Sequence, residues 1–104
     1  MSGFDAALAH HRAGRLQQAE AAYRKVIEKA PEHAQALFLQ GAICLASQRA
    51  EEALALSRRA AALYPDNALY LSNLGEAQRR LGHLEEATEV LVRAVTLRSM
   101  PTSG

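Results

Sequence analysis

A repeat of about 34 residues constrains this chain more than any other feature. Pro31 and Pro65 are one such period apart, and so are Gly41 and Gly75. Other small or apolar residues keep the same interval, namely Ala19, Ala53 and Ala87, then Ala60 and Ala94, then Leu37 and Leu71. Such a period is typical of stacked supersecondary units, each too small to bury its own apolar face. The 104 residues hold three such units, at 1–33, 34–67 and 68–98, and a tail at 99–104 that we expect to fray.

The composition favours helices within each unit. Apolar residues make up 49% of the chain and aromatic residues only 5%, with alanine and leucine the commonest. Pro31 and Pro65 end helices, and Gly14 and Gly82 suit the left-handed residue that commonly follows a helix. We therefore expect an all-α fold of six helices, at residues 4–13, 16–30, 34–47, 50–64, 68–81 and 84–98.

The third expected helix, residues 34–47, is apolar on nearly every side. Leu37 and Cys44 lie on one stripe with Gly41, and Phe38 lies on another. A helix of this kind is usually buried on most of its surface. Glycine inside a helix costs about 1 kcal/mol relative to alanine, so we expect close approach of a neighbouring helix at Gly41.

Several classes of function are disfavoured by charge and composition. A net charge of +1 gives no bulk attraction to nucleic acid or to a membrane surface. The nearly apolar run at 34–46 is much shorter than the roughly 20 residues of a membrane span. No signal peptide is visible, and the single Cys44 allows no internal disulfide. We expect a cytoplasmic protein without nucleic-acid or membrane partners.

The period and its marker residues resemble the tetratricopeptide repeat (TPR) family over roughly residues 3–98. The matching positions are Ala7, Ala19, Tyr23 and Pro31 in the first repeat; Leu37, Gln40, Gly41, Cys44, Ala53, Ser57 and Pro65 in the second; and Leu71, Leu74, Gly75, Ala87 and Leu91 in the third. The resemblance implies three helix–turn–helix hairpins stacked into a right-handed superhelical solenoid. It also implies that the first helix of each hairpin lines a concave groove.

The resemblance places a candidate binding site on the groove face of these three helices. Its residues would be Phe4, Leu8, His11, Phe38, Ala42, Leu45, Ser72, Asn73, Glu76, Arg79 and Arg80. Such a groove, apolar at one end and polar at the other, would bind an extended or helical peptide of a partner protein. The same face also fits packing within the fold or against a second copy of the chain, which would make it a homo-oligomer through the apolar groove. The adjacent arginines also fit a solvated edge.

Two other functions remain open at this point. The last hairpin has no helix after it in the sequence, so Leu91 and Val95 should be partly uncovered. Either the sequence is part of a longer protein, or another copy covers this end, which would make the chain a homo-oligomerisation domain. The second alternative is a TPR segment of a larger enzyme such as a glycosyltransferase.

The residues of this chain do not match one specialisation of the family, the binding of a chaperone's C-terminal carboxylate. Family members that grip the C-terminal carboxylate of chaperones do so with lysine, asparagine and arginine on the groove helices. The matching positions here are Phe4, Leu8, Leu39, Leu69 and Asn73, and of these only Asn73 offers an amide. A carboxylate needs such donors to replace its water, so we predict no chaperone carboxylate clamp.

The sequence offers no set of residues for catalysis or metal binding. His10 and His11 are adjacent and face different directions, while His33 and His83 lie in expected turns. Cys44 has no partner at metal-ligand spacing, and neither a nucleophile elbow nor a phosphate-binding loop is present. We therefore expect a non-catalytic interaction module without a metal or cofactor.

Overall fold

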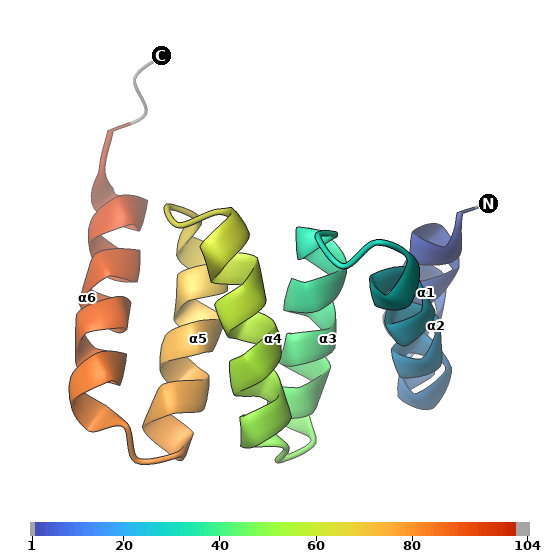
Figure 1. Ribbon diagram of the computed structural model, residues 1–104, viewed down its shortest axis with the longest axis horizontal. Coiled ribbons are helices and arrows are strands. Elements are labelled where there is room, and N and C mark those ends of the chain that lie inside the picture. Colours follow the sequence, from blue (N-terminus) through green and yellow to red (C-terminus); the bar gives the residue numbers. More distant parts are fainter. Residues whose placement is uncertain (1, 102–104) are drawn as a thin grey trace.

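The computed structural model describes residues 2–101 and contains six α-helices over that range, with no strand. They are α1 (Gly3–Arg12), α2 (Leu16–Lys29), α3 (Ala34–Ala46), α4 (Ala50–Leu63), α5 (Ala68–Arg80) and α6 (Leu84–Ser99), in chain order across the molecule (Figure 1). The expected all-α fold is confirmed, and each helix end lies within one residue of its expected place. Met100 and Pro101 follow α6 as exposed chain, and the remainder of the expected tail, 102–104, lies outside the described residues.

The helix ends follow from local chemistry. The Asn67 side chain accepts a hydrogen bond from the backbone N–H of Tyr70 at 3.1 Å, which caps the start of α5. Gly14 and Gly82 follow α1 and α5 with φ of 78° and 84°. Gln48 occupies the equivalent place after α3 with φ of 63°, so all three first helices end on a left-handed residue.

The six helices form three hairpins that stack in a row. Helices α1 and α2, α3 and α4, and α5 and α6 pack extensively, and so do α4 and α5 across the second junction. Among the described helices, α3 also contacts α5, whereas α4 and α6 make no comparable contact. The stack therefore curves, with α1, α3 and α5 on its inner side. The radius of gyration is 14.0 Å, above the roughly 13 Å of a compact domain of this length.

The two junctions between hairpins are joined by equivalent ion pairs. Arg24 on α2 lies 3.2 Å from Glu52 on α4, and Arg58 on α4 lies 3.9 Å from Glu86 on α6. Each partner of the second pair stands one repeat period after its counterpart in the first. Exposed pairs like these contribute only about 0–1 kcal/mol, but their recurrence shows that neighbouring hairpins are related by translation along the stack.

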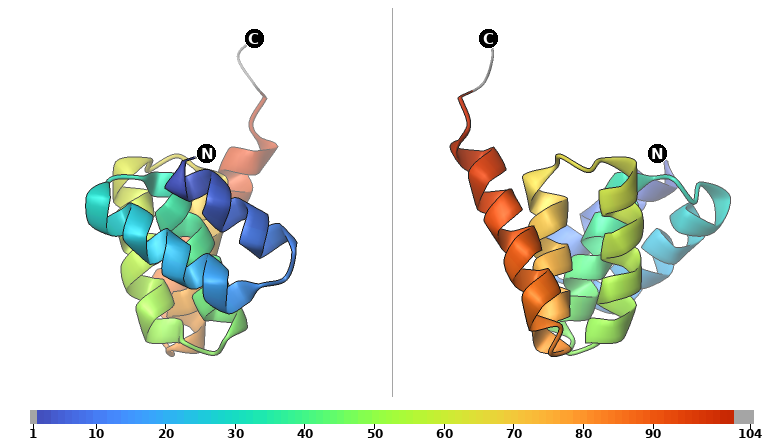
Figure 2. Two further views of the ribbon diagram at one scale, coloured as in Figure 1. Left: turned by 90° about the vertical axis from the view of Figure 1, so that its right-hand side faces the viewer. Right: turned by 60° about the vertical axis from the view of Figure 1, so that its left-hand side comes forward.

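The first junction is nevertheless more polar than the second. Gln40 on α3, only 1% exposed, donates a hydrogen bond to the Glu20 carboxylate on α2 at 3.0 Å, and Arg49 donates to the same carboxylate at 2.7 Å. Desolvation is the largest single influence on the pKa of Glu20 and raises it, but these hydrogen bonds and the charges of Arg49 and Arg24 together lower it. At the position equivalent to Gln40 the third repeat has Leu74. The first hairpin also packs less extensively on the second than the second does on the third (Figure 2).

The expected burial of α3 is confirmed. The close approach of a neighbouring helix, which we expected at Gly41, is tighter at the equivalent Gly75. Eight residues of α3 are buried. A Cβ added at Gly75 would lie 2.5 Å from Cγ of Leu91, whereas one at Gly41 would lie 3.4 Å from Oγ of Ser57, at the edge of ordinary contact. Ser57 is small, so at Gly41 the helices leave room that is absent at Gly75.

Candidate functional site

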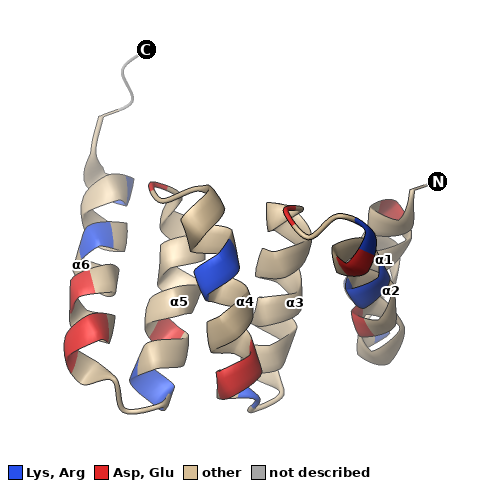
Figure 3. Cartoon of the chain, in the orientation of Figure 1, with Lys and Arg blue, Asp and Glu red and all other residues tan. Residues whose placement is uncertain are grey.

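The inner side of the stack carries the residues that the sequence placed in the groove. Phe4, Leu8 and His11 on α1, Phe38 and Ala42 on α3, and Ser72, Asn73 and Glu76 on α5 are half-buried, Arg79 and Arg80 are exposed, and Leu45 is buried. Helix α3, in the middle of this surface, carries no charged residue (Figure 3). The surface is therefore aromatic and aliphatic over α3 and becomes charged over the end of α5.

At the α1 end, two of the predicted residues take part in internal packing. The ring of Phe4 lies 4.5 Å from that of His33, measured between centroids, and 6.2 Å from that of Tyr23. Nδ1 of His11 lies 2.9 Å from the Tyr23 hydroxyl oxygen. These contacts hold the first hairpin together and connect it to the start of α3.

In the middle of the inner side, three aromatic rings form a continuous run. The Phe38 ring on α3 lies 5.1 Å from that of Tyr70 on α5, and the Tyr70 ring lies 6.1 Å from that of Tyr64 at the end of α4. Offset and edge-on pairs at such distances are favourable beyond the area that they bury. The run leads from the inner side to the edge of the stack. Because the Phe38 ring packs against the Tyr70 ring, its position is fixed.

At the α5 end, one carboxylate organises two arginines. Glu76 lies 2.6 Å from Arg79 and 2.9 Å from Arg80. The hydrogen bond from Arg79, and then that from Arg80, hold the pKa of Glu76 at about 2 despite some desolvation. Arg80 also donates to the backbone carbonyl of Leu45, which fixes its guanidinium, whereas Arg79 remains more exposed.

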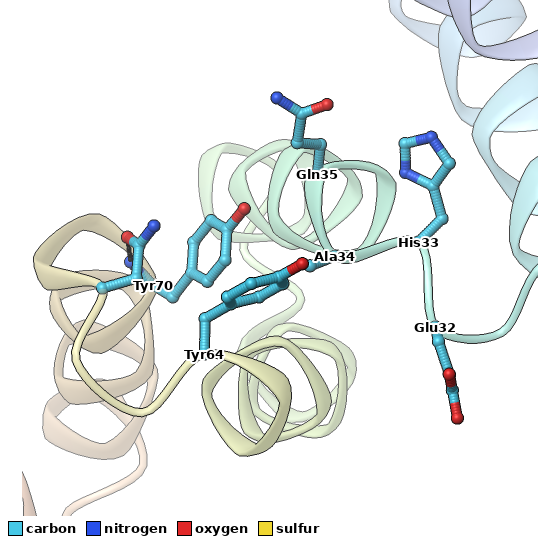
Figure 4. Close-up of a pocket in the computed structure, with 7 residues that line it drawn as sticks. Glu32, His33, Ala34, Gln35, Tyr64 and Tyr70 are labelled. Atoms are coloured by element: carbon cyan, nitrogen blue, oxygen red, sulfur yellow. Dashed lines mark hydrogen bonds between the residues drawn. The ribbon is translucent and has the colours of Figure 1, made fainter.

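A cavity of about 400 Å³ lies at the edge of this surface, beside the first turn of α3. Figure 4 shows its lining, which consists of Glu32, His33, Ala34, Gln35, Tyr64, Asn67 and Tyr70. No sequence pattern groups these residues. Tyr64 and Tyr70 come together only because the α4–α5 loop brings the end of one helix beside the start of the next.

The two ends of the stack carry exposed apolar surface. A groove of about 630 Å³ opens between α1 and α2, with Lys25 and Lys29 in its lining. At the other end, α6 leaves Leu84, Val92 and Val95 about 60% exposed. The expected exposure of the last hairpin is thus present at Val95, while Leu91 is half-buried.

Among residues 2–101 no three metal-ligating side chains are grouped closely enough to hold an ion. The Cys44 thiol is buried, which raises its pKa to about 11, so it is a neutral thiol and a poor nucleophile. No helix in the described range combines the length and apolar character needed to cross a membrane.

Comparison with known families agrees with the fold. A sequence profile for the tetratricopeptide repeat matches residues 4–68, and a second profile of the same description matches residues 68–93. The chain therefore belongs to the tetratricopeptide repeat family. Proteins of this family generally act as protein-interaction modules. No curated protein sequence matches the chain significantly.

Three solved structures similar to the chain come from larger proteins. MamA (residues 41 to the end) from Desulfovibrio magneticus RS-1 is 27% identical with a TM-score of 0.84, over 91% of this chain and 54% of that one. A K341M mutant of the O-GlcNAc transferase from Thermobaculum terrenum is 32% identical with a TM-score of 0.83, over 92% of this chain and 18% of that one. Another MamA structure, 17% identical with a TM-score of 0.82, supports the fold alone. The chain thus spans about half of the first of these proteins and less than a fifth of the transferase.

Proposed function

We propose that the chain is a non-catalytic module that binds a segment of a partner protein along its inner side. The observation that carries this proposal is the half-buried Phe38, which lies against Tyr70 on a helix without charged residues. An apolar anchor held in a fixed position contributes most of the affinity at such surfaces, and a preformed scaffold loses little entropy on binding. Leu8 and Ala42 extend the apolar area, and Ser72 and Arg79 supply polar contacts at its end.

A peptide selection tests the proposal. A displayed library of random peptides is selected against the purified chain, and the affinities of enriched peptides are measured by fluorescence anisotropy. Replacing Phe38 by alanine should weaken binding at least tenfold, because truncation of a central aromatic anchor typically costs about 2 kcal/mol or more.

The matched control removes apolar surface away from the inner side. Val95→Ala on the exposed face of α6 should leave the affinity of the selected peptides unchanged. Failure to enrich any peptide, or equal affinities for Phe38→Ala and the unaltered chain, would argue against the proposal.

A second function, head-to-tail self-association, is favoured by the two ends of the stack. The groove at the first end exists because α1 has Gly3 and Ala6 where α5, two periods later, has Leu71 and Leu74. The exposed apolar face of α6 could fill such a groove. Charge supports this pairing, since Lys25 and Lys29 border the groove and α6 carries exposed glutamates, Glu85 and Glu89.

Sedimentation velocity over a concentration series tests self-association. The chain should show concentration-dependent dimers and longer species, and Val92→Glu should abolish them, because a charge would be buried against an apolar groove. Lys25→Glu with Lys29→Glu should weaken association, and a chain that also carries Glu85→Lys with Glu89→Lys should recover it. A monomer at all concentrations up to hundreds of micromolar would exclude this second function.

A further inference from the structure

The cavity beside the first turn of α3 contains a tyrosine hydroxyl without a partner. Tyr70 is only 7% exposed, because its ring packs between those of Phe38 and Tyr64. Its hydroxyl oxygen has no hydrogen-bond partner among residues 2–101, and it points toward the cavity that Ala34 and Gln35 also line (Figure 4). The hydroxyl opens on the cavity and is free to donate a hydrogen bond to an acceptor bound there.

The start of α3, where Ala34 and Gln35 line the cavity, also offers backbone donors. The N–H of Ala36 is satisfied by Nδ1 of His33 at 3.2 Å, and that of Leu37 by the carbonyl of His33 at 3.1 Å. The N–H groups of Ala34 and Gln35, which precede them, have no acceptor within the described part of the chain. The first N–H groups of a helix carry partial positive charge and favour an anion.

Several side chains around the cavity can also donate hydrogen bonds. Burial, and then the neighbouring Tyr64, raise the pKa of Tyr70, so its phenol stays protonated at neutral pH and donates. Tyr64 and Gln35, whose hydroxyl and amide groups can donate, also line the cavity (Figure 4). Glu32 is the one carboxylate in the lining, and Figure 4 shows its side chain directed away from both tyrosine hydroxyls.

The arrangement disfavours a cation in this cavity. An ammonium or guanidinium group binds over an aromatic face, and the Tyr70 ring is already packed against those of Phe38 and Tyr64. The Tyr64 ring is 57% exposed, but the start of a helix repels positive charge. Free N–H groups at a helix N-terminus, beside hydroxyls that can donate, match a group that bears negative charge and only accepts hydrogen bonds.

We propose that this cavity binds the carboxylate of an aspartate or glutamate side chain in the partner segment. The inference rests on the proposed function, because the partner would occupy the inner side at Phe38 and extend past Tyr70 to the edge. The cavity is distinct from the positions of the chaperone carboxylate clamp, which lie at Phe4, Leu8, Leu39, Leu69 and Asn73. A volume of about 400 Å³ is ample for one acidic side chain with its local backbone.

The pair of phenols that lines the cavity occurs at one place along the repeats, where the second repeat meets the third. One period before Tyr64 and Tyr70 the chain has Ala30 and Ala36, and one period after Tyr64 it has Arg98. Neither other repeat therefore has a pair of phenols at this place. The carboxylate specificity would be set at one position along the partner, next to the aromatic anchor.

The peptides selected against the chain test the inference directly. They should carry aspartate or glutamate at a fixed distance from their apolar anchor. Tyr70→Phe, which keeps the packed ring and removes only the hydroxyl, should weaken the acidic peptide about tenfold, since a hydrogen bond to a charged group is lost. It should leave the affinity of the matching asparagine or glutamine peptide unchanged. Glu32→Gln should tighten the acidic peptide by up to about twofold, because a nearby like charge is removed.

A titration without any peptide tests the carboxylate site separately from the proposed binding of a partner segment. Sodium acetate titrated into the labelled chain at constant ionic strength should shift the amide resonances of Ala34 and Gln35, and methylammonium chloride should not. The Tyr64→Phe, Tyr70→Phe double variant should lose the acetate shift while its other amide resonances stay in place.

Each outcome decides between the proposals. Selected peptides with lysine, arginine or no charge at this position, or an unchanged affinity for Tyr70→Phe, would overturn the carboxylate site and leave the proposed function intact. If no peptide is enriched, the proposed function fails, and the acetate titration decides whether the cavity binds a carboxylate.

Discussion

Replacing Tyr23 by alanine is expected to lower the free energy of unfolding by about 3–5 kcal/mol, the range for truncating a large buried aromatic side chain. Tyr23 is fully buried between α1 and α2, beside Phe4, and its hydroxyl is paired with His11. Tyr23→Phe keeps the ring and should cost only about 1 kcal/mol, the typical net worth of one hydrogen bond. Chemical unfolding followed by circular dichroism measures both variants.

The loss in Tyr23→Ala should be local. In a stack of repeats each unit is stabilised by itself and by its neighbours, and the first junction is the more polar and less extensive one. Hydrogen exchange should therefore show that α1 and α2 lose protection while α5 and α6 keep theirs. Equal loss of protection along the whole chain, or equal destabilisation by Tyr23→Phe, would contradict this description of the stack.

The second large effect is expected at Gly75. A Cβ there would already lie 2.5 Å from Leu91, so leucine at this position must push α6 away from α5. We expect Gly75→Leu to destabilise the chain by about 3 kcal/mol, at the upper end of the usual cost of overpacking. The measurement is the same denaturant unfolding, read at the helical signal.

The matched variant is Gly41→Ala, for which the sign should be opposite. The added Cβ would meet Oγ of Ser57 at 3.4 Å, and alanine gains about 1 kcal/mol over glycine in a helix interior. We expect Gly41→Ala to stabilise the chain by about 0.5–1 kcal/mol. Destabilisation by Gly41→Ala, or normal stability of Gly75→Leu, would show that the helix contacts at these two glycines are misplaced.

Much of the fold could be predicted because it follows from local and periodic signals. Pro31, Pro65, Gly14 and Gly82 end helices through backbone chemistry that depends only on the residue itself. The repeat period then predicts that hairpins recur along the chain, and the ion pairs at equivalent positions agree with this. The burial of α3 followed from its apolar residues on nearly every side.

The remainder depends on which side chains meet across the stack. Gly41 and Gly75 occupy equivalent positions in the repeat. The residues opposite them, Ser57 and Leu91, differ in size, so the space beside the two glycines differs. Only the tertiary packing shows which residue lies opposite each glycine. Gln40 interrupts an apolar stripe, and no pattern in the sequence indicates that Glu20 accepts a hydrogen bond from its amide nitrogen.

The candidate site on the inner side stays a prediction, and the structure adds details that the sequence did not indicate. The inner side of α1, α3 and α5 was expected from the family resemblance, and Phe38 is available there. Tyr64 and Tyr70 were missed because they lie at the ends of different helices and no periodic pattern connects them. Leu45 was expected at the groove and is buried, since its side chain belongs to the main hydrophobic core.

Amide chemical-shift mapping with a selected peptide tests the central claim most directly. The account predicts that the largest shifts fall on the inner side, around Phe38, Ala42, Tyr70 and Ser72, and that they disappear in Phe38→Ala. Shifts confined to the outer surfaces of α2 and α4, or to the end faces of α1 and α6, would contradict it.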